Sequence, residues 1–326
     1  MALLETNVRL RAYDHIAPLF LGDVATDGIK LNLNHRPPLT LQMDERVDIA
    51  EVSLNRYLVA YARGDRSLVG IPAFILRGFR HRNFFVRADS PLQSLADLRN
   101  CRIGTDAWPD TGTMWARAAM RDAGVDVGDV DWVIGQLDPN LPRKPPGSAD
   151  ALTPRNLEFL PESDFLVDAL LSGRLDAVTV AFAPDEVFKP GGRIRRLVRD
   201  YRAVERDYFQ RTGIYPPFHI VAARRDFAEA NPWVLPVIYD ALKSAFDLWV
   251  IKVKRFAEAT PWAMEEMETM LHDFAGHTPP FGMDLPAHRA MMKVMCEEHF
   301  QQGLVTTPAD PASLFADFEA IAAAHR

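Results

Sequence analysis

The sequence predicts an α/β protein built from two lobes. Its 326 residues exceed one ordinary domain of roughly 100–200 residues and suit two. Strand-like apolar segments alternate with helical segments from residue 8 to residue 223, which favours sheets with helical crossovers. Hydrophobic residues make up 48% of the chain and charged residues 25%, so it can bury a core and remain soluble.

The first lobe begins with strands. We predict them at residues 8–12, 28–33, 47–50 and 68–74, from short apolar or alternating runs. A helix is expected to begin at Ser53, a good N-cap, and to end near Gly64, a residue that suits a helix C-terminus.

The second lobe repeats this alternation. Strands are expected at 83–86, 101–104, 131–134 and 177–181, with helices at 114–123 and 165–171. Residues 138–156 contain five prolines and no periodicity, which predicts a long surface loop. The basic stretch 193–211 is broken by acidic residues and is interpreted as a solvated helical face.

A strand at 218–223 leads back to the first lobe, and the rest of the chain reads as helical. We therefore predict one lobe from residues 1–86 and 218–326 and the other from 87–217, with a ligand cleft between the lobes. The helical C-terminal region offers surfaces on which a homo-oligomer could form.

Composition excludes several functions. The net charge is −7 and basic residues are scattered, so a nucleic-acid partner is not expected. Cys101 and Cys296 are the only cysteines, which excludes a disulfide scaffold. No apolar run reaches the roughly 18 residues of a membrane span, and the N-terminus lacks a basic segment followed by an apolar one. We expect a cytoplasmic protein without a membrane partner.

Five segments occur in an order and spacing that resembles the 4,5-dihydroxyphthalate decarboxylase family: Tyr13–His15, Asp48–Leu54, Arg77–His81, Asp200–Ala203 and Arg211–His219. The similarity continues through Pro280–Gly282 and Glu298–Leu304. Residues 108–111 and 138–156 depart from the family pattern, which bears on the identity of the substrate.

The resemblance implies a type II periplasmic-binding-protein fold and conversion of 4,5-dihydroxyphthalate to protocatechuate and CO2. Direct loss of CO2 would leave an aryl carbanion, so the easier route first protonates the ring carbon that bears the carboxylate. That route needs a general acid, cations or amides that hold carboxylates, and an acceptor for a phenolic proton. It needs no organic cofactor.

Four residues are candidates for the proton transfers. His81 is the first choice for the general acid, with a structural histidine as the equal alternative. Glu51 is placed to accept the phenolic proton, or else to complement a helix dipole. His15 follows the first strand, where this fold class places ligand contacts, or serves a turn. His219 is a second acid–base group or a buried strand residue.

Six residues are candidates for substrate binding. Arg80 could clamp a carboxylate in a two-pronged fork. The loop 104–113 precedes a predicted helix whose free amides attract an anion, and Thr111 and Thr113 in this loop could add hydroxyl donors. Trp108 could stack on an aromatic ring. Tyr215 completes this set, and Ser53 joins it although an N-cap is its more natural role.

Other interpretations stay open. His15, Glu51, His81 and His219 could hold a divalent metal such as zinc, although no metal-type spacing supports this and we predict none. The chain could instead be a non-catalytic binding protein or sensor for a small carboxylate, a decarboxylase of another hydroxybenzoate, or a pyrimidine-precursor-type enzyme of the same superfamily. The later histidines His272, His277, His288, His299 and His325 are expected to be solvated.

Overall fold

The structure is a computed structural model that describes residues 2–35, 46–141, 157–256, 261–273 and 279–325. The chain divides into two compact units. Unit 1 comprises Met1–Arg77, Pro217–Lys293 and Ala309–Arg326, and unit 2 comprises Gly78–Pro216 and Val294–Pro308. This division differs from the expected lobes, because residues 78–86 and 294–308 pack with unit 2.

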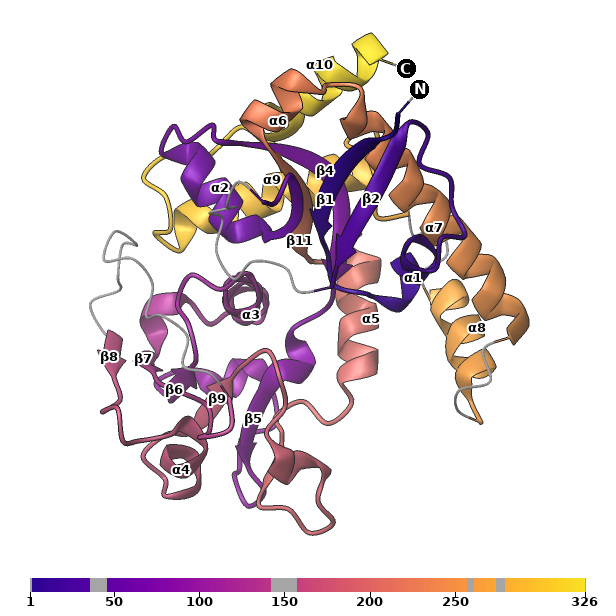
Figure 1. The fold of residues 1–326 in the computed structure, drawn as a ribbon. Helices are drawn as coiled ribbons and strands as arrows, with labels where there is room; N and C mark the ends of the chain where they lie inside the picture. Colours follow the sequence, from indigo (N-terminus) through magenta and orange to yellow (C-terminus); the bar gives the residue numbers. More distant parts are fainter. Residues whose placement is uncertain (1, 36–45, 142–156, 257–260, 274–278, 326) are drawn as a thin grey trace. The chain divides into compact units, whose positions relative to one another are not determined.

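Unit 1 is built on a five-stranded sheet of order β2-β1-β3-β11-β4 (Figure 1). The strands are β1 (Leu4–Arg9), β2 (Ile29–Asn34), β3 (Ile49–Ser53), β4 (Leu68–Arg77) and β11 (Pro217–Arg224). β1 pairs in parallel with β2 and β3, whereas β11 runs antiparallel to both β3 and β4. The carboxyl ends of β1, β3 and β4 and the start of β11 therefore share one edge of the sheet.

Helices cover this sheet. They are α1 (Ala17–Phe20), α2 (Leu54–Ala62), α6 (Arg225–Ala230), α7 (Val234–Phe256), α8 (Ala263–Asp273) and α10 (Ala316–His325), with 3-10 helices at Asp14–Ile16 and Ser313–Phe315. α9 (Pro286–Gln301) begins in unit 1 and ends in unit 2.

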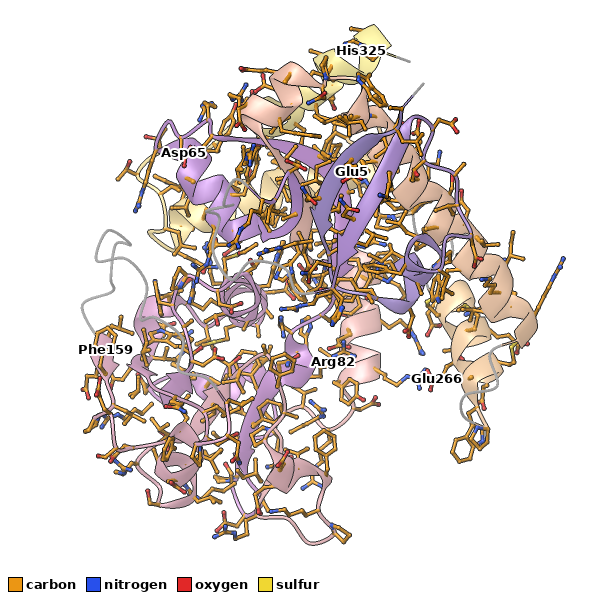
Figure 2. The ribbon with its side chains drawn as sticks, in the orientation of Figure 1. Glu5, Asp65, Arg82, Phe159, Glu266 and His325 are labelled. Atoms are coloured by element: carbon orange, nitrogen blue, oxygen red, sulfur yellow. The ribbon has the colours of Figure 1, made fainter. Side chains whose placement is uncertain are left out.

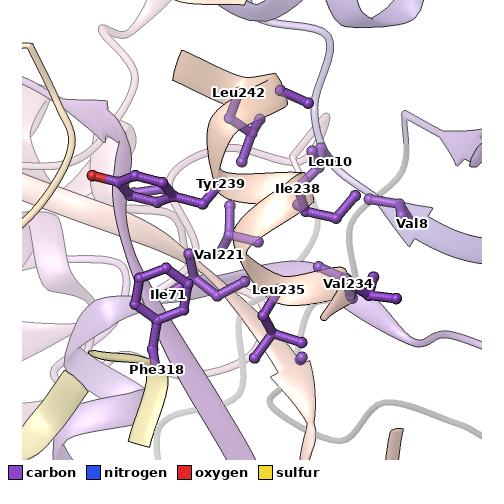
Figure 3. Packing of buried hydrophobic residues seen from close by; sticks show 14 of the residues in the cluster. Val8, Leu10, Ile71, Val221, Val234, Leu235, Ile238, Tyr239, Leu242 and Phe318 are labelled. Atoms are coloured by element: carbon purple, nitrogen blue, oxygen red, sulfur yellow. The ribbon is translucent and has the colours of Figure 1, made fainter. Parts of the chain in front are cut away.

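The core of unit 1 forms where α7 meets the sheet. Leu235, Ile238 and Leu242 recur at helical spacing on α7 and are buried with Val8 and Val221 of the strands (Figure 3). Burying such a side chain contributes roughly 1.5–3 kcal/mol. This packing holds the sheet that carries the polar edge described below.

Local signals set the ends of α2. The side chain of Ser53 accepts a hydrogen bond from the Arg56 amide, so Ser53 is the N-cap. Gly64 follows the helix with a φ of +87°, a left-handed conformation that favours glycine. Both ends agree with the sequence prediction.

Unit 2 contains a six-stranded sheet of order β10-β5-β9-β6-β7-β8. Its strands are β5 (Phe84–Arg87), β6 (Arg102–Thr105), β7 (Asp131–Ile134), β8 (Leu157–Phe159), β9 (Ala177–Thr179) and β10 (Ile194–Arg196). The helices are α3 (Thr111–Asp122), α4 (Leu166–Leu171) and α5 (Tyr201–Thr212), with 3-10 helices at His81–Asn83, Leu95–Leu98, Val127–Asp129 and Asp185–Phe188. Phe159, on the edge strand β8, is exposed (Figure 2).

The predicted α/β fold class is confirmed in both sheets, and the helical C-terminal region is present. Two local predictions need correction, and one strand had not been predicted. The first strand runs from Leu4 to Arg9 rather than from 8 to 12. Its start was missed because one of its buried positions is the polar residue Thr6, which hides the alternation of apolar and polar residues. Strand β8 was not foreseen, and the basic stretch 193–211 holds strand β10 as well as helix α5. Most of the predicted loop 138–156 lies outside the described residues.

No helix in the described part of the chain combines the length and the hydropathy that a membrane crossing requires.

Candidate active site

The polar edge of the unit 1 sheet brings together residues that are far apart in the sequence. Val221 of β11 lies opposite Glu51 of β3, and His219 lies opposite Ser53. Glu51 and His219 are therefore diagonal neighbours on the same face of the sheet. Three of the four predicted catalytic residues, His15, Glu51 and His219, meet at this edge of unit 1.

The carboxylate of Glu51 is the centre of this cluster, with only 1% of its side chain exposed. Its Oε1 atom accepts hydrogen bonds from the Tyr13 hydroxyl, at 2.7 Å, and from Nδ1 of His219. Its Oε2 atom accepts the backbone amide of Arg11 at 2.9 Å. A buried carboxylate with three donors is held in one orientation.

These donors also keep Glu51 ionised. Burial alone would raise the pKa of Glu51, but the hydrogen bond and charge of His219, the Tyr13 hydroxyl and the Arg11 amide together lower it below its usual value. Burial, together with the neighbouring Glu51 charge, raises the pKa of Tyr13, so this tyrosine remains a hydrogen-bond donor at neutral pH.

The Glu51–His219 pair can move a proton. Because a carboxylate only accepts hydrogen bonds, Nδ1 of His219 carries the hydrogen and Nε2 is left for proton exchange. The His219 side chain is 23% exposed, so the ring is reachable while Glu51 is not. An anionic partner at Nδ1 compensates the charge that the ring carries when Nε2 is protonated.

His15 stands beside this pair. Its Nε2–H donates to the carbonyl of Ile75 at 2.8 Å, and its ring stacks on Tyr13 with centroids 5.5 Å apart. Burial lowers the pKa of His15, and the charge of Arg77 lowers it further although the Ile75 hydrogen bond opposes this. The ring is thus neutral at neutral pH, with a lone pair on Nδ1.

In unit 2, Arg80 lies against the start of α3. A Cβ atom added at Gly112 would stand 2.6 Å from the Arg80 Cζ atom, so the guanidinium packs directly on the first helical turn. Burial lowers the pKa of Arg80, partly offset by the charges of Asp110 and Asp106. Arg80, Thr111 and Thr113 were each predicted as substrate-binding residues, and the structure gathers Arg80 and both threonines at one helix N-terminus.

This turn has the chemistry of an anion site. Asp110 is the N-cap of α3, and its Oδ1 atom accepts the amide of Gly112 at 2.9 Å. The hydroxyls of Thr105 and Thr113 lie 3.3 Å apart. A guanidinium beside the positive end of a helix dipole attracts carboxylates, and the fork of an arginine can bind both carboxylate oxygens.

Trp108 takes a packing role in the structure. Its ring is buried, with the Arg117 guanidinium 3.9 Å from its centroid and the edge-on Trp132 ring at 5.4 Å. This burial does not favour the prediction that Trp108 stacks on a substrate ring. Trp115, on α3, is likewise buried.

His81 differs from His219 in its surroundings. Its ring is buried in unit 2 against Phe79 and Tyr208, and its Nδ1 atom has no hydrogen-bond partner among the described residues. Burial lowers the pKa of His81 to about 4. The ring is therefore neutral at neutral pH, a state that does not favour His81 as the proton donor.

The remaining substrate candidates have structural partners. Ser53 caps α2. Tyr215 is half-buried, and its ring centroid lies 5.0 Å from that of Phe79. Both residues lie near the ends of the segment 78–216, where the Gly78 amide donates to the Pro216 carbonyl.

The donor geometry does not favour the metal alternative. Among the described residues, no group of three or more His, Cys, Asp or Glu side chains is arranged to hold an ion. In particular, both Glu51 oxygens and His15 Nε2 are already engaged by protein groups.

Sequence reasoning missed several participants. The hydroxyl of Tyr13 and the amide of Arg11 hold Glu51, and the Tyr13–His15 motif was the only signal for them. Two later histidines were wrongly expected to be solvated. His288 and His299 are buried, and each ring satisfies its Nδ1 atom with a backbone carbonyl, that of Gly282 and Met295 respectively. His272 and His325 are exposed, and His277 lies outside the described residues.

Two mixed sheets with these strand orders, covered by helices, place the protein in the type II periplasmic-binding-protein fold class. The periplasmic aliphatic sulphonate binding protein SsuA of Escherichia coli superposes with a TM-score of 0.54 at 14% identity, over 96% of this chain and 97% of that one. The desulfurization enzyme DszB superposes with a TM-score of 0.52 at 17% identity, over 99% and 100%. These similarities establish the fold alone.

Sequence similarity is more specific. The chain is 30% identical over 261 residues to 4,5-dihydroxyphthalate decarboxylase of Comamonas testosteroni, which covers 76% of this chain and 75% of that protein. It is 30% identical over 227 residues to the enzyme of the same name from Pseudomonas putida, 64% of this chain and 83% of that protein. No protein-family model matches the chain. The chain belongs to the 4,5-dihydroxyphthalate decarboxylase family.

Proposed function

We propose that this protein decarboxylates a hydroxylated aromatic acid, and that its substrate is 4,5-dihydroxyphthalate. The observation that carries the proposal is the Glu51–His219 pair, a partly exposed imidazole oriented by a buried carboxylate, in a chain of a decarboxylase family. A protein that only holds its ligand has no need of a group placed for proton transfer.

His219 is the proposed general acid. Its protonated ring passes the Nε2 proton to the ring carbon that bears the leaving carboxylate, while the hydroxyl para to that carbon supplies the electrons and loses its own proton. The bond between the ring carbon and the carboxylate then breaks, and its electron pair restores the aromatic ring as CO2 leaves. The phenolic oxygen takes its proton back from the group that had accepted it. One proton is consumed for each CO2 released, and His219 regains it from water.

The roles of Glu51 and His15 follow from their hydrogen bonds. Glu51 is a positioning residue rather than the acceptor of the phenolic proton, because both its oxygens are engaged and its side chain is enclosed. His15 has a neutral ring with Nε2–H on the Ile75 carbonyl, so its Nδ1 atom is the proposed acceptor.

Unit 2, considered by itself, contains a turn that we propose binds a carboxylate. Arg80 and the first turn of α3, with Thr111 and Thr113, have the charge and donors that a carboxylate requires. Replacing Arg80 by lysine would keep the charge and lose the fork, so we expect Arg80→Lys to raise KM by about tenfold or more with a smaller effect on kcat.

The direct test is to incubate the purified protein with 4,5-dihydroxyphthalate and to measure CO2 release and protocatechuate formation. A panel of mono- and dihydroxybenzoates in the same assay distinguishes a decarboxylase of another aromatic acid. Saturable binding of these acids without CO2 release from any of them would refute the enzymatic proposal and leave a binding protein.

A further inference from the structure

The interior of unit 2 encloses a charged side chain that the proposed reaction does not use. Arg117, in the middle of α3, is 1% exposed. Its Nη1 and Nη2 atoms each donate to the Trp108 carbonyl at 3.1 Å, and its Nε atom donates to Oε1 of Gln302 at 2.6 Å. A buried guanidinium is tolerated only when its donors are satisfied, so these contacts are fixed features of the fold.

Gln302 connects the same network to the start of α3. Its Nε2 atom donates to the carbonyl of Met114 at 3.0 Å and to Oε2 of Glu298 at 2.8 Å. Gln302 and Glu298 lie in the segment Val294–Pro308, which packs with unit 2 although it is more than 100 residues away from α3 in the sequence. One amide group therefore contacts both Arg117 and the first turn of α3.

The turn before α3 is held from two sides as a result. The carbonyl of Trp108 is fixed by the two donors of Arg117, and the indole ring of Trp108 lies under the guanidinium and against Trp132. Trp108 precedes the N-cap Asp110 by two positions and Gly112 by four. Any shift of Trp108 would thus move the backbone on which Arg80 packs.

We propose that Arg117 and Gln302 are positioning residues for the carboxylate-binding turn, and that Val294–Pro308 acts on substrate binding through them. The inference rests on the proposed function, because it assumes that Arg80 and the turn at Asp110–Thr113 hold a substrate carboxylate. Arg117 and Gln302 do not touch the substrate in this proposal. They keep the turn at Asp110–Thr113 in the position in which the Arg80 guanidinium packs on it.

The test variant is Gln302→Met, which keeps the volume and flexibility of the side chain and removes every hydrogen bond it makes. Val133→Ala truncates the unit 2 core on the face of β7 opposite to Trp132, and it is the matched control for general destabilisation. Gln302→Asn, one methylene shorter and still an amide, covers the case in which the methionine variant does not fold. Three quantities are measured: kcat and KM for 4,5-dihydroxyphthalate, the Kd of unreactive phthalate, and amide hydrogen exchange of residues 108–113.

We expect Gln302→Met to raise KM and the phthalate Kd about tenfold with kcat within about twofold, and to speed exchange at residues 108–113 but not in β7. Val133→Ala should change none of these selectively. If KM and exchange at 108–113 change no more in Gln302→Met than in Val133→Ala, the proposal is overturned. Faster exchange with an unchanged KM would also overturn it, because the turn would then not bind substrate.

Failure of the proposed function has a different signature. If the unmodified protein releases no CO2 from any acid in the panel, the reaction is wrong whatever the variants do. Phthalate binding and hydrogen exchange still decide the positioning proposal in that event, since neither readout depends on turnover.

Discussion

The guanidinium of Arg80 packs on the backbone of Gly112, so closely that the space of one methyl group at position 112 is already filled. Two residues that are 32 positions apart in the sequence therefore share one site at the start of α3. Glycine in a helix is unfavourable by about 1 kcal/mol relative to alanine, and here its small size admits the arginine.

Gly112→Ala should displace Arg80. We expect KM for the dicarboxylate substrate to rise about tenfold, equivalent to ~1.4 kcal/mol of binding, with kcat much less affected. Steady-state kinetics on the purified variant measures both quantities. Gly128→Ala is the matched control, because a Cβ there meets no atom within 4 Å. Equal KM values for the two variants would place the carboxylate elsewhere.

His219→Asn should reduce kcat by about 10²–10⁴, the usual contribution of a general acid. Glu51→Gln should reduce kcat less, because the imidazole remains but loses its anionic partner. His81→Asn serves as the comparison, since His81 is enclosed and its pKa is lowered to about 4 by burial. A larger loss of kcat in His81→Asn than in His219→Asn would transfer the general-acid role to His81.

The burial of His299 should make the stability of the protein depend on pH. Burial lowers the pKa of His299 from 6.5 to about 4, although its hydrogen bond to the Met295 carbonyl opposes this. Between pH 6.5 and 4 the unfolded chain thus binds a proton that the folded chain does not, and the free energy of unfolding falls as the pH falls through this window. The full loss for this one residue is roughly 3 kcal/mol.

The check is chemical denaturation of wild type and His299→Leu at several pH values from 7 to 4. Leucine fills a similar volume and cannot ionise, so the stability of the variant should fall less steeply over this range. His81 adds a loss of the same sign to both proteins. Parallel curves for the two proteins would show that His299 does not carry this pH dependence.

Ser53→Ala separates a structural role from a substrate contact. Loss of the N-cap of α2 should lower the free energy of unfolding by about 1 kcal/mol and leave KM unchanged. Ser53→Asp, which keeps a capping oxygen, should retain stability. A KM change in Ser53→Ala without a change in stability would restore Ser53 as a substrate contact.

Structural features that depend only on residues close together in the sequence could be predicted. Ser53 and Gly64 mark the ends of α2 by their own chemistry, and most strands follow from short apolar runs. The pairing of Glu51 with His219 could not be predicted, because it depends on β11 entering the sheet between β3 and β4. Both residues were chosen as candidates, but for separate reasons.

The misplaced histidines show a second limit. A polar residue in a helix is usually assigned to the solvent face, yet His299 is buried with its Nδ1–H on the Met295 carbonyl, and His288 is buried in the same way on the Gly282 carbonyl. The local sequence does not reveal such a backbone partner. Likewise, the sequence around Arg117 contains no signal that its hydrogen-bond partner is Gln302.

The late position of β11 fixes the order in which a ribosome can complete the two sheets. All six strands of unit 2 lie between Phe84 and Arg196, so their sheet can close while the nascent chain still lacks residues 217–224. The first four strands of unit 1 are made earlier but must wait for β11 to join β3 to β4. Translation therefore supplies all strands of the unit 2 sheet before the last strand of the unit 1 sheet, although Gln302, the partner of Arg117 in unit 2, is added later. A product terminated before His219 would leave Glu51 without this partner and would lack the general acid of the proposed reaction, whatever else had folded.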